Sequence, residues 1–269
     1  MKICRIIPIA LLVLLSAAFL SARQPKNLRD AQGRKQGFWE AVDGRGHLVY
    51  TGYFKDDRPV GEMKRYHPGG GVRVIMLYDE KGERARSRFF RQNGELAARG
   101  NYFRARRDSV WTFYSAHTRE VTYMIEYREG ARHGRSQKFY PGGSIAEETL
   151  WANDRREGKW QQFFESGQVK MTATYRDNQL EGGFFVYYPD GKRETEGFYR
   201  NDHPEGKWVH YNLDGTVAST VEYRNGVIAN LGELTAAEQV FFKRIEAEKG
   251  SIREPTVEDL IRESERQSP

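Results

Sequence analysis

The chain has 269 residues, enough for one large domain or two small ones, but its composition limits what it can build. Hydrophobic residues make up only 38%, aromatic residues reach 13%, glycine numbers 27, and the mean hydropathy is -0.77. This combination excludes a thick aliphatic core and favours short strands, tight turns and flat rings that supply most of the buried surface. We therefore expect an all-β fold.

The N-terminal 22 residues have the three parts of a secretory signal peptide. Lys2 and Arg5 precede an apolar run over residues 6–15, and small residues follow in SAAFLSA. Cleavage after Ala22 or after Ala18 fits this pattern, which predicts an exported protein that is periplasmic, at the cell surface or secreted. An uncleaved N-terminal membrane anchor is the alternative, because the apolar run is just short of a comfortable membrane span.

The single cysteine, Cys4, lies inside this predicted signal peptide. Its removal would leave a chain without thiols, so we expect no disulfide-linked oligomer, no thiolate metal site and no cysteine nucleophile. Loss of Lys2 and Arg5 also lowers the formal net charge from +6 to +4. A balance that small gives no reason to expect nucleic-acid binding.

A repeat with a period of 24 residues follows a short predicted linker at residues 23–36. Eight units cover residues 37–229, and their first residues, here called origins, are Gly37, Gly61, Ala85, Ser109, Gly134, Gly158, Gly182 and Gly206. Seven of the eight units have an aromatic residue five positions after the origin. Every unit has a ring seventeen or eighteen positions after it, namely Phe54, Tyr78, Tyr102, Tyr127, Trp151, Tyr175, Tyr199 and Tyr223.

Each unit is predicted to be one β-hairpin. The first strand runs from the origin to about the sixth residue, and a turn such as ESGQ follows, where glycine supplies a positive φ. In the second strand Val169, Met171 and Ala173 fall on one face. A second, longer turn such as RDNQLE returns the chain to the next origin. We therefore expect an elongated single-layer antiparallel sheet of about sixteen strands, whose rings stack from unit to unit.

Tryptophan stands two positions after the origin in four units, at Trp39, Trp111, Trp160 and Trp208. Trp160 and the ring of Phe163 are three residues apart, so a regular strand would point them to opposite faces. Either a β-bulge shifts one of them or both faces of the sheet carry rings.

Units of the form G-x-W-x-x-Y/F, with a turn glycine and a later aromatic residue before a polar turn, resemble MORN repeats. They are more closely similar to the bacterial MORN-variant family labelled YwqK-type antitoxin. The resemblance covers residues 37 to about 226 and is best in units five to eight, at GRSQKFYPGGS, GKWQQFFESGQ, GGFFVYYPDGK and GKWVHYNLDGT. Units three and four depart from it at Ala85, Ser109 and Thr118, so irregular hairpins are expected there. The resemblance implies serial hairpins and a role in binding or scaffolding, with membrane surfaces, lipid headgroups or partner proteins as ligands.

After Gly226 the repeat ends, and residues 230–269 are predicted to be a helical C-terminal tail. Thr235 and Glu238 form a capping box that predicts a helix over residues 236–249, and Pro255 introduces a second short helix. We expect these helices to cover the last strand and its rings, because repeat arrays need capped ends. Docking on a partner is the alternative.

No set of side chains has catalytic or metal-ligand spacing, so we expect no enzyme, no cofactor and no metal. The histidines are scattered over different units, at His47, His67, His117, His133, His203 and His210. Glu157, Glu181 and Glu205 recur directly before three origins, which favours a structural role over a catalytic one.

Arginine accumulates around the third unit. Residues 84–107 contain one acid, Glu95, and eight arginines: Arg84, Arg86, Arg88, Arg91, Arg99, Arg104, Arg106 and Arg107. Guanidinium groups form forked hydrogen bonds to phosphate and carboxylate, so this run is a candidate site for an anion or a partner. A solvated face that keeps an edge-rich sheet soluble is the alternative.

These features favour an exported, non-enzymatic module for protein binding or scaffolding in the bacterial cell envelope. Peripheral binding of anionic membrane lipid or glycolipid through the arginines is one alternative. An antitoxin or immunity role, which the family label implies, is another.

Overall fold

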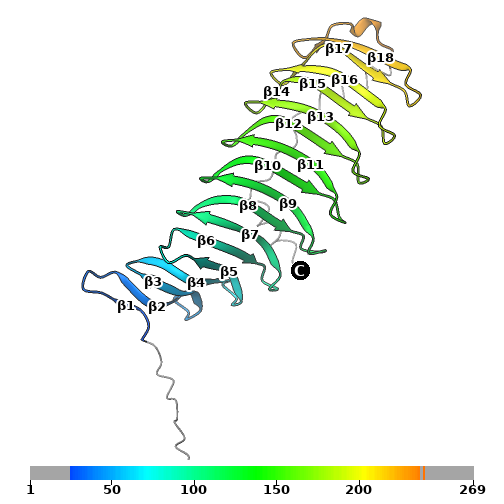
Figure 1. Cartoon of the computed structure of the whole chain (residues 1–269). Coiled ribbons are helices and arrows are strands. Elements are labelled where there is room, and N and C mark those ends of the chain that lie inside the picture. Colours follow the sequence, from blue (N-terminus) through cyan, green and yellow to red (C-terminus); the bar gives the residue numbers. More distant parts are fainter. Residues whose placement is uncertain (1–24, 237–238, 240–269) are drawn as a thin grey trace, which may run out of the picture.

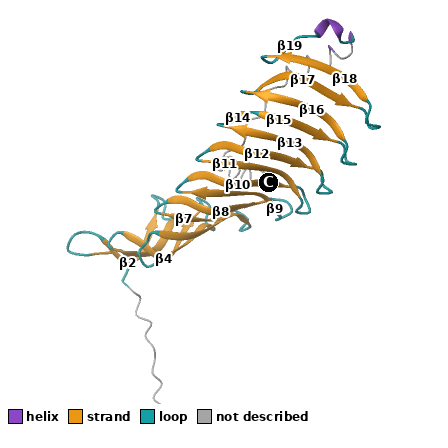
Figure 2. Ribbon diagram, turned by 45° about the horizontal axis from the view of Figure 1, so that its top comes forward, coloured by secondary structure: helices purple, strands orange, loops and turns teal. Residues whose placement is uncertain are grey.

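The protein is seen in a computed structural model that describes residues 25–236 and 239. These residues form one open antiparallel sheet of 19 strands in a single elongated, twisted layer (Figure 1). The long strands pair with one another in the order of the chain, and Figure 2 shows no helix over either face of the described sheet. The predicted fold of serial hairpins is confirmed.

Eight long hairpins correspond to the eight units. They pair β2 (Lys35–Val42) with β3 (Leu48–Lys55), β4 (Arg58–Tyr66) with β5 (Val72–Tyr78), β6 (Arg84–Phe90) with β7 (Leu96–Phe103), β8 (Arg106–Tyr114) with β9 (Val121–Arg128), β10 (Ala131–Phe139) with β11 (Ile145–Ala152), β12 (Arg155–Phe163) with β13 (Val169–Arg176), β15 (Gly182–Tyr187) with β16 (Arg193–Arg200), and β17 (His203–Tyr211) with β18 (Val217–Arg224). Three strands of two residues, β1 (Leu28–Arg29), β14 (Gln179–Leu180) and β19 (Val227–Ile228), complete the sheet, with a 3-10 turn at Leu231–Glu233. Because β1 pairs with β2, residues 28–29 and 35–36 of the stretch expected to be a linker belong to the sheet.

The return to the next origin is shorter than predicted in every unit except the second, where residues 79–83 separate the two strands. Between β3 and β4 the turn consists of Asp56 and Asp57 alone, both with positive φ (52° and 64°), which is the two-residue hairpin turn that suits strand twist. Asp and Asn tolerate this conformation, so no longer loop is needed. Gly61 lies inside β4, with a φ of 64°, where the register between β3 and β4 shifts. The origin glycine therefore marks a β-bulge and not the end of a turn.

The same positive φ recurs at the other origin glycines, Gly37, Gly134, Gly158, Gly182 and Gly206. The third unit lacks it, because Ala85 pairs with Tyr78 in a ladder that has no register shift. In the fourth unit Ser109 adopts a φ of 58°, which costs a residue other than glycine about 1–2 kcal/mol. The third unit is thus irregular at its origin, whereas the fourth keeps the bulge of the repeat with a serine in place of glycine.

The core is a stripe of rings along one face of the sheet, here called the ring face. Trp111 is completely buried, and its ring meets Tyr102 of the preceding unit edge to face at 5.1 Å between centroids and Tyr127 of its own unit at 6.4 Å. The same arrangement recurs at other units. It includes Trp208 between Tyr199 and Tyr223, Trp39 on Phe54, and Trp160 on Tyr175. Each ring is therefore buried by its neighbours along the array.

Glycines on the adjacent strand make room for two of these tryptophans. A Cβ atom on Gly100 would lie 2.3 Å from the ring of Trp111, and one on Gly197 would lie 2.2 Å from the ring of Trp208. In unit five a serine takes the place of the tryptophan, and Trp151 donates a hydrogen bond of 2.8 Å from its indole N–H to the Ser136 hydroxyl. In each of these cases a large ring on one strand faces a small residue on the neighbouring strand.

The opposite face of the sheet, here called the outer face, also carries rings. The Tyr211 hydroxyl donates to Glu196 at 2.6 Å, and Glu196 directly precedes Gly197, which supports Trp208 on the ring face. Adjacent residues of a strand point to opposite faces, so Tyr211 lies on the outer face. Rings therefore lie on both faces, and a register shift also stands between Gln162 and Phe163, so both alternatives for the ring spacing are present.

Side chains also connect one unit to the next through backbone groups. The Tyr140 hydroxyl donates to the Phe163 carbonyl at 2.9 Å, and the Tyr188 hydroxyl donates to the Tyr211 carbonyl at 2.7 Å. The recurring glutamates have a structural part. Glu157, Glu181 and Glu205 accept hydrogen bonds of 2.8, 2.9 and 2.8 Å from the backbone N–H groups of Asp177, Asn201 and Asn225 in the following turns.

At each end of the sheet an asparagine side chain makes hydrogen bonds to backbone groups that would otherwise pair with a further strand. The Asn27 side chain accepts from the Glu40 N–H at 2.8 Å and donates to the Glu40 carbonyl at 3.0 Å. Asn230 accepts from the Glu222 N–H at 3.0 Å and donates to the Thr220 carbonyl at 3.2 Å. Leu234 packs on the last cluster of rings around Trp208. The helices predicted for residues 236–249 and after Pro255 lie outside the described residues, except for Ala236 and Gln239.

The glycine under Trp111 gives a test of the ring stripe. Gly100→Ala should lower the free energy of unfolding by about 1–3 kcal/mol, because the methyl group forces a buried, rigid indole to move. Denaturant unfolding followed by tryptophan fluorescence measures the change. Gly44→Ala is the control, because its Cβ would meet no atom within 4 Å. A Gly100→Ala protein as stable as the control would contradict this packing.

Candidate binding surface

Three of the eight arginines, Arg86, Arg88 and Arg99, lie together on the outer face and are here called the basic face. Ser87 between the first two is buried and bonds to the Gly100 carbonyl, which places Arg86 and Arg88 opposite the ring stripe. In the register of β6 and β7, Arg88 stands directly opposite Arg99. All three side chains are exposed, and none has a carboxylate at ion-pair distance within residues 25–236. Arg88 and Arg99 lie 6.0 and 5.9 Å from the ring centroids of Phe90 and Tyr114.

Two equivalent cations elsewhere on the outer face are neutralised, whereas Lys159 and Lys207, at the position of Arg86 in units six and eight, are exposed without an ion pair among the described residues. Arg135 occupies the position of Arg86 in unit five and lies 3.4 Å from Glu148. Lys64 occupies the position of Arg88 in unit two and lies 2.8 Å from Glu62. Like charges directly opposite each other on neighbouring strands destabilise a sheet. The uncompensated pair in the third unit is therefore a departure with a cost in stability, which favours a role in binding.

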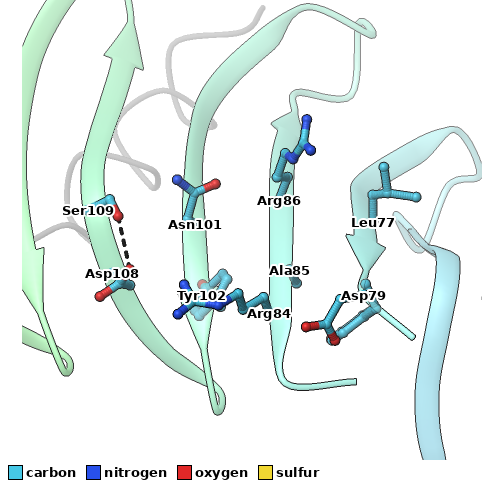
Figure 3. A pocket seen from close by; sticks show the side chains of 10 residues that line it. Leu77, Asp79, Arg84, Ala85, Arg86, Asn101, Tyr102, Asp108 and Ser109 are labelled. Carbon is cyan, nitrogen blue, oxygen red and sulfur yellow. Dashed lines mark hydrogen bonds between the residues drawn. The ribbon is translucent and has the colours of Figure 1, made fainter. Parts of the chain in front are cut away.

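Apolar side chains flank the basic face. Leu77, the register partner of Arg86, is 51% exposed, and Val110 on β8 is 40% exposed. Together with the basic face and Glu62, which pairs with Lys64, they line an open depression of about 430 Å³. Figure 3 shows Leu77, Arg86 and Asn101 pointing to the same side of three successive strands. The surface therefore offers both positive charge and uncovered apolar area.

Three more arginines lie near the strand ends. Arg84 and Arg104 stack on the ring of Phe103, at 4.6 and 5.1 Å from its centroid, and Arg104 also pairs with Glu83 at 3.2 Å. Arg106 is exposed at the start of β8. These side chains stand beside the turns and not within the basic face.

The last two arginines have contacts within the fold. Arg91 is only 1% exposed and donates to the carbonyl oxygens of Leu96, at 2.8 Å, and Tyr114. Burial lowers the pKa of its guanidinium. Arg107 lies over the ring of Trp111, at 5.2 Å from its centroid, and so belongs to the ring face. The structure therefore does not bring the eight arginines into one cluster.

Glu95, the one acid of the arginine-rich run, is already engaged. Its carboxylate accepts a hydrogen bond of 2.7 Å from Arg119, and that bond, with a second from Asn93, holds the pKa of Glu95 below its ordinary value. Glu95 therefore does not compensate the positive charge of the basic face.

Sequence reasoning missed Asn101, Leu77 and Val110 as neighbours of the arginines. Asn101 and Leu77 occupy the same position of the unit, sixteen residues after the origins Ala85 and Gly61. That equivalence is visible in the sequence. Which residues of the neighbouring strands stand opposite Arg86 depends on the register, and the missing bulge at Ala85 changes that register.

The described residues contain neither a metal site nor a membrane-spanning helix. Among those that the structure describes, no three His, Asp or Glu side chains could hold a metal ion together. The described part of the chain also contains no helix long and apolar enough to cross a membrane.

The fold and its two faces define a serial β-hairpin repeat protein. Four consecutive copies of the MORN repeat variant match residues 132–153, 156–177, 180–201 and 204–225, so this part of the chain consists of MORN-variant repeats. The match falls on units five to eight, where the resemblance is best in the sequence. The YwqK-type antitoxin label is not confirmed.

No curated protein matches the chain. One similar solved structure is a mutant of S. aureus TarM in complex with Fondaparinux, alpha-GlcNAc-glycerol and UDP, with 10% identity over 45% of this chain and 21% of that chain and a TM-score of 0.29. Another is the GtfA/B complex, with 14% identity over 49% of this chain and 20% of that chain and a TM-score of 0.19. The chain spans about a fifth of the length of these structures, and such weak likeness carries no functional argument.

The free energy of unfolding can distinguish the arginines that are bonded within the fold from those that are exposed on the basic face. Arg91→Gln should lower the free energy of unfolding by about 1–3 kcal/mol, because it leaves buried carbonyl groups without a donor. Arg88→Gln should change it by less than about 0.5 kcal/mol, since this exposed side chain has no ion pair to lose. Urea unfolding of both variants measures the difference. Equal losses would show that the two arginines have the same environment.

Proposed function

We propose that this repeat module is an exported, non-enzymatic protein that binds another protein of the bacterial cell envelope through the basic face. The observation that carries the proposal is the set of uncompensated Arg86, Arg88 and Arg99 beside exposed Leu77 and Val110. Arginine next to apolar side chains is the composition typical of the centre of a protein interface.

The partner is expected to present acidic side chains to this surface. Carboxylates accept paired, charge-assisted hydrogen bonds from a guanidinium, and an apolar residue nearby would cover Leu77 and Val110. The sheet beneath is rigid, because Ser87 and Gly100 are buried against the ring stripe. A preformed surface of this kind loses little conformational entropy on binding. The export step rests on the predicted signal peptide, which lies outside the described residues.

Peripheral binding to anionic membrane lipid or glycolipid is the second candidate, since phosphate groups accept the same forked hydrogen bonds. The uncompensated charge favours it, but Leu77 and Val110 stand in one small depression instead of a broad apolar band. A lipid surface would require more of the array to take part.

The triple variant Arg86→Gln, Arg88→Gln and Arg99→Gln tests the proposal. The matched control changes Arg128, Arg176 and Arg224 to Gln, which removes the same charge from exposed arginines on other hairpins. After crosslinking in the envelope, the control should capture the same partner as the wild type, and the basic-face variant should lose it at least tenfold. Equal capture by both variants would overturn the proposal. Salt-sensitive pelleting with anionic vesicles, lost only in the basic-face variant, would instead favour the lipid candidate.

A further inference from the structure

A second depression, of about 360 Å³, opens where units three and four break the repeat (Figure 3). The missing bulge at Ala85 and the strained Ser109 both lie in its wall. Its volume is within the range of small-molecule sites, about 300–1,000 Å³. Backbone strain and irregular pairing in an otherwise regular array occur where a function compensates for their cost.

The charged side chains of Asp79 and Arg84 line this pocket and are engaged, Asp79 by the Glu83 N–H at 2.8 Å and Arg84 by the ring of Phe103. Two further polar side chains of the lining have no intramolecular partners among the described residues. The Arg86 guanidinium and the Asn101 amide stand opposite each other in the register of β6 and β7. Neither side chain has a hydrogen-bond or ion-pair partner among residues 25–236. They provide a forked cationic donor and an amide that can both donate and accept.

Asp108 adds an acceptor on the other side. It occupies the position before the origin where Glu157, Glu181 and Glu205 reach forward to the N–H of the next turn. Asp108 is one methylene shorter, and its hydrogen bond within the described chain comes from the Ser109 hydroxyl at 2.9 Å. The Asp108 carboxylate thus does not accept the backbone hydrogen bond that the equivalent glutamates accept. It keeps free acceptor sites in the pocket wall.

We infer that this pocket binds an acidic sugar, that is, a sugar ring with an anionic group close to free hydroxyls. Arg86 would bind the anionic group through two parallel hydrogen bonds. Asp108 and Asn101 would accept hydrogen bonds from the hydroxyls. A plain anion fits less well, because the Asp108 carboxylate repels it and would gain no hydroxyl donor. The anionic group can be a carboxylate, as in a uronic acid, or a phosphate, as in a sugar phosphate.

This inference shares Arg86 with the basic face but does not depend on the protein-binding proposal. Arg88 and Arg99 line the neighbouring depression and not this pocket. The double variant Arg88→Gln and Arg99→Gln should therefore weaken partner capture and leave sugar binding unchanged. Failure of one proposal can be told apart from failure of the other.

Calorimetric titration of the full protein with glucuronate, glucose 1-phosphate, glucose and inorganic phosphate tests the inference. At least one of the two acidic sugars should bind about tenfold or more tightly than both glucose and phosphate, and which one binds identifies the anionic group. Phosphate that binds as tightly as the acidic sugars, or no binding by either sugar, would overturn the inference.

Two variants connect the binding to the pocket. Asp108→Asn should weaken the acidic sugar about tenfold and leave phosphate binding equal or tighter. Ser109→Gly should raise the melting temperature, because glycine removes the strain of the positive φ. It should nevertheless weaken binding of the acidic sugar, because it removes the hydroxyl that orients the Asp108 carboxylate. Asp190→Asn, in a turn of the seventh hairpin, is the control and should bind as the wild type does. Unchanged sugar affinity in both pocket variants would place the binding elsewhere.

Discussion

A single-layer sheet has no second layer to cover its core, so each buried ring must be covered by the strands before and after it. Trp111 meets this constraint fully, since it is completely buried between Tyr102 and Tyr127. The backbone of Gly100 beneath it allows the close approach. Stability is therefore a property of neighbouring units, as expected for a repeat array in which each unit touches only the next. The ends, which lack one neighbour, need the caps that Asn27 and Asn230 provide.

The same constraint separates architecture from function. Positions that recur in register, such as Trp208 or the glutamates before the origins, are occupied by packing and by hydrogen bonds to turns. What remains for binding is the outer face and the places where the repeat is broken. Both meet in units three and four, where Arg88 and Arg99 oppose each other without compensation and Ser109 adopts a glycine conformation.

Much of the fold could be predicted from the sequence, because the 24-residue period and the aromatic spacing depend only on positions along the chain. The role of Gly61 could not, since a bulge and a turn both call for a positive φ and only the pairing of β3 and β4 distinguishes them. The arginine-rich run was also visible. Its division was not, because Arg91 is buried by bonding to a carbonyl 23 residues away, while Arg88 is exposed by strand alternation. The partners of Arg86, namely Leu77 and Asn101, follow from a register that the sequence does not state.

Removal of one complete unit tests most directly that neighbouring units stabilise one another. Deletion of residues 158–181 joins Glu157 to Gly182 and restores the same Glu-Gly step that stands at residues 181–182. The shortened protein should keep its β-sheet circular dichroism per residue and unfold cooperatively, with a modest decrease in melting temperature. Deletion of residues 158–169, half a unit, should disrupt the array. Loss of folded structure on removal of the whole unit would contradict the account.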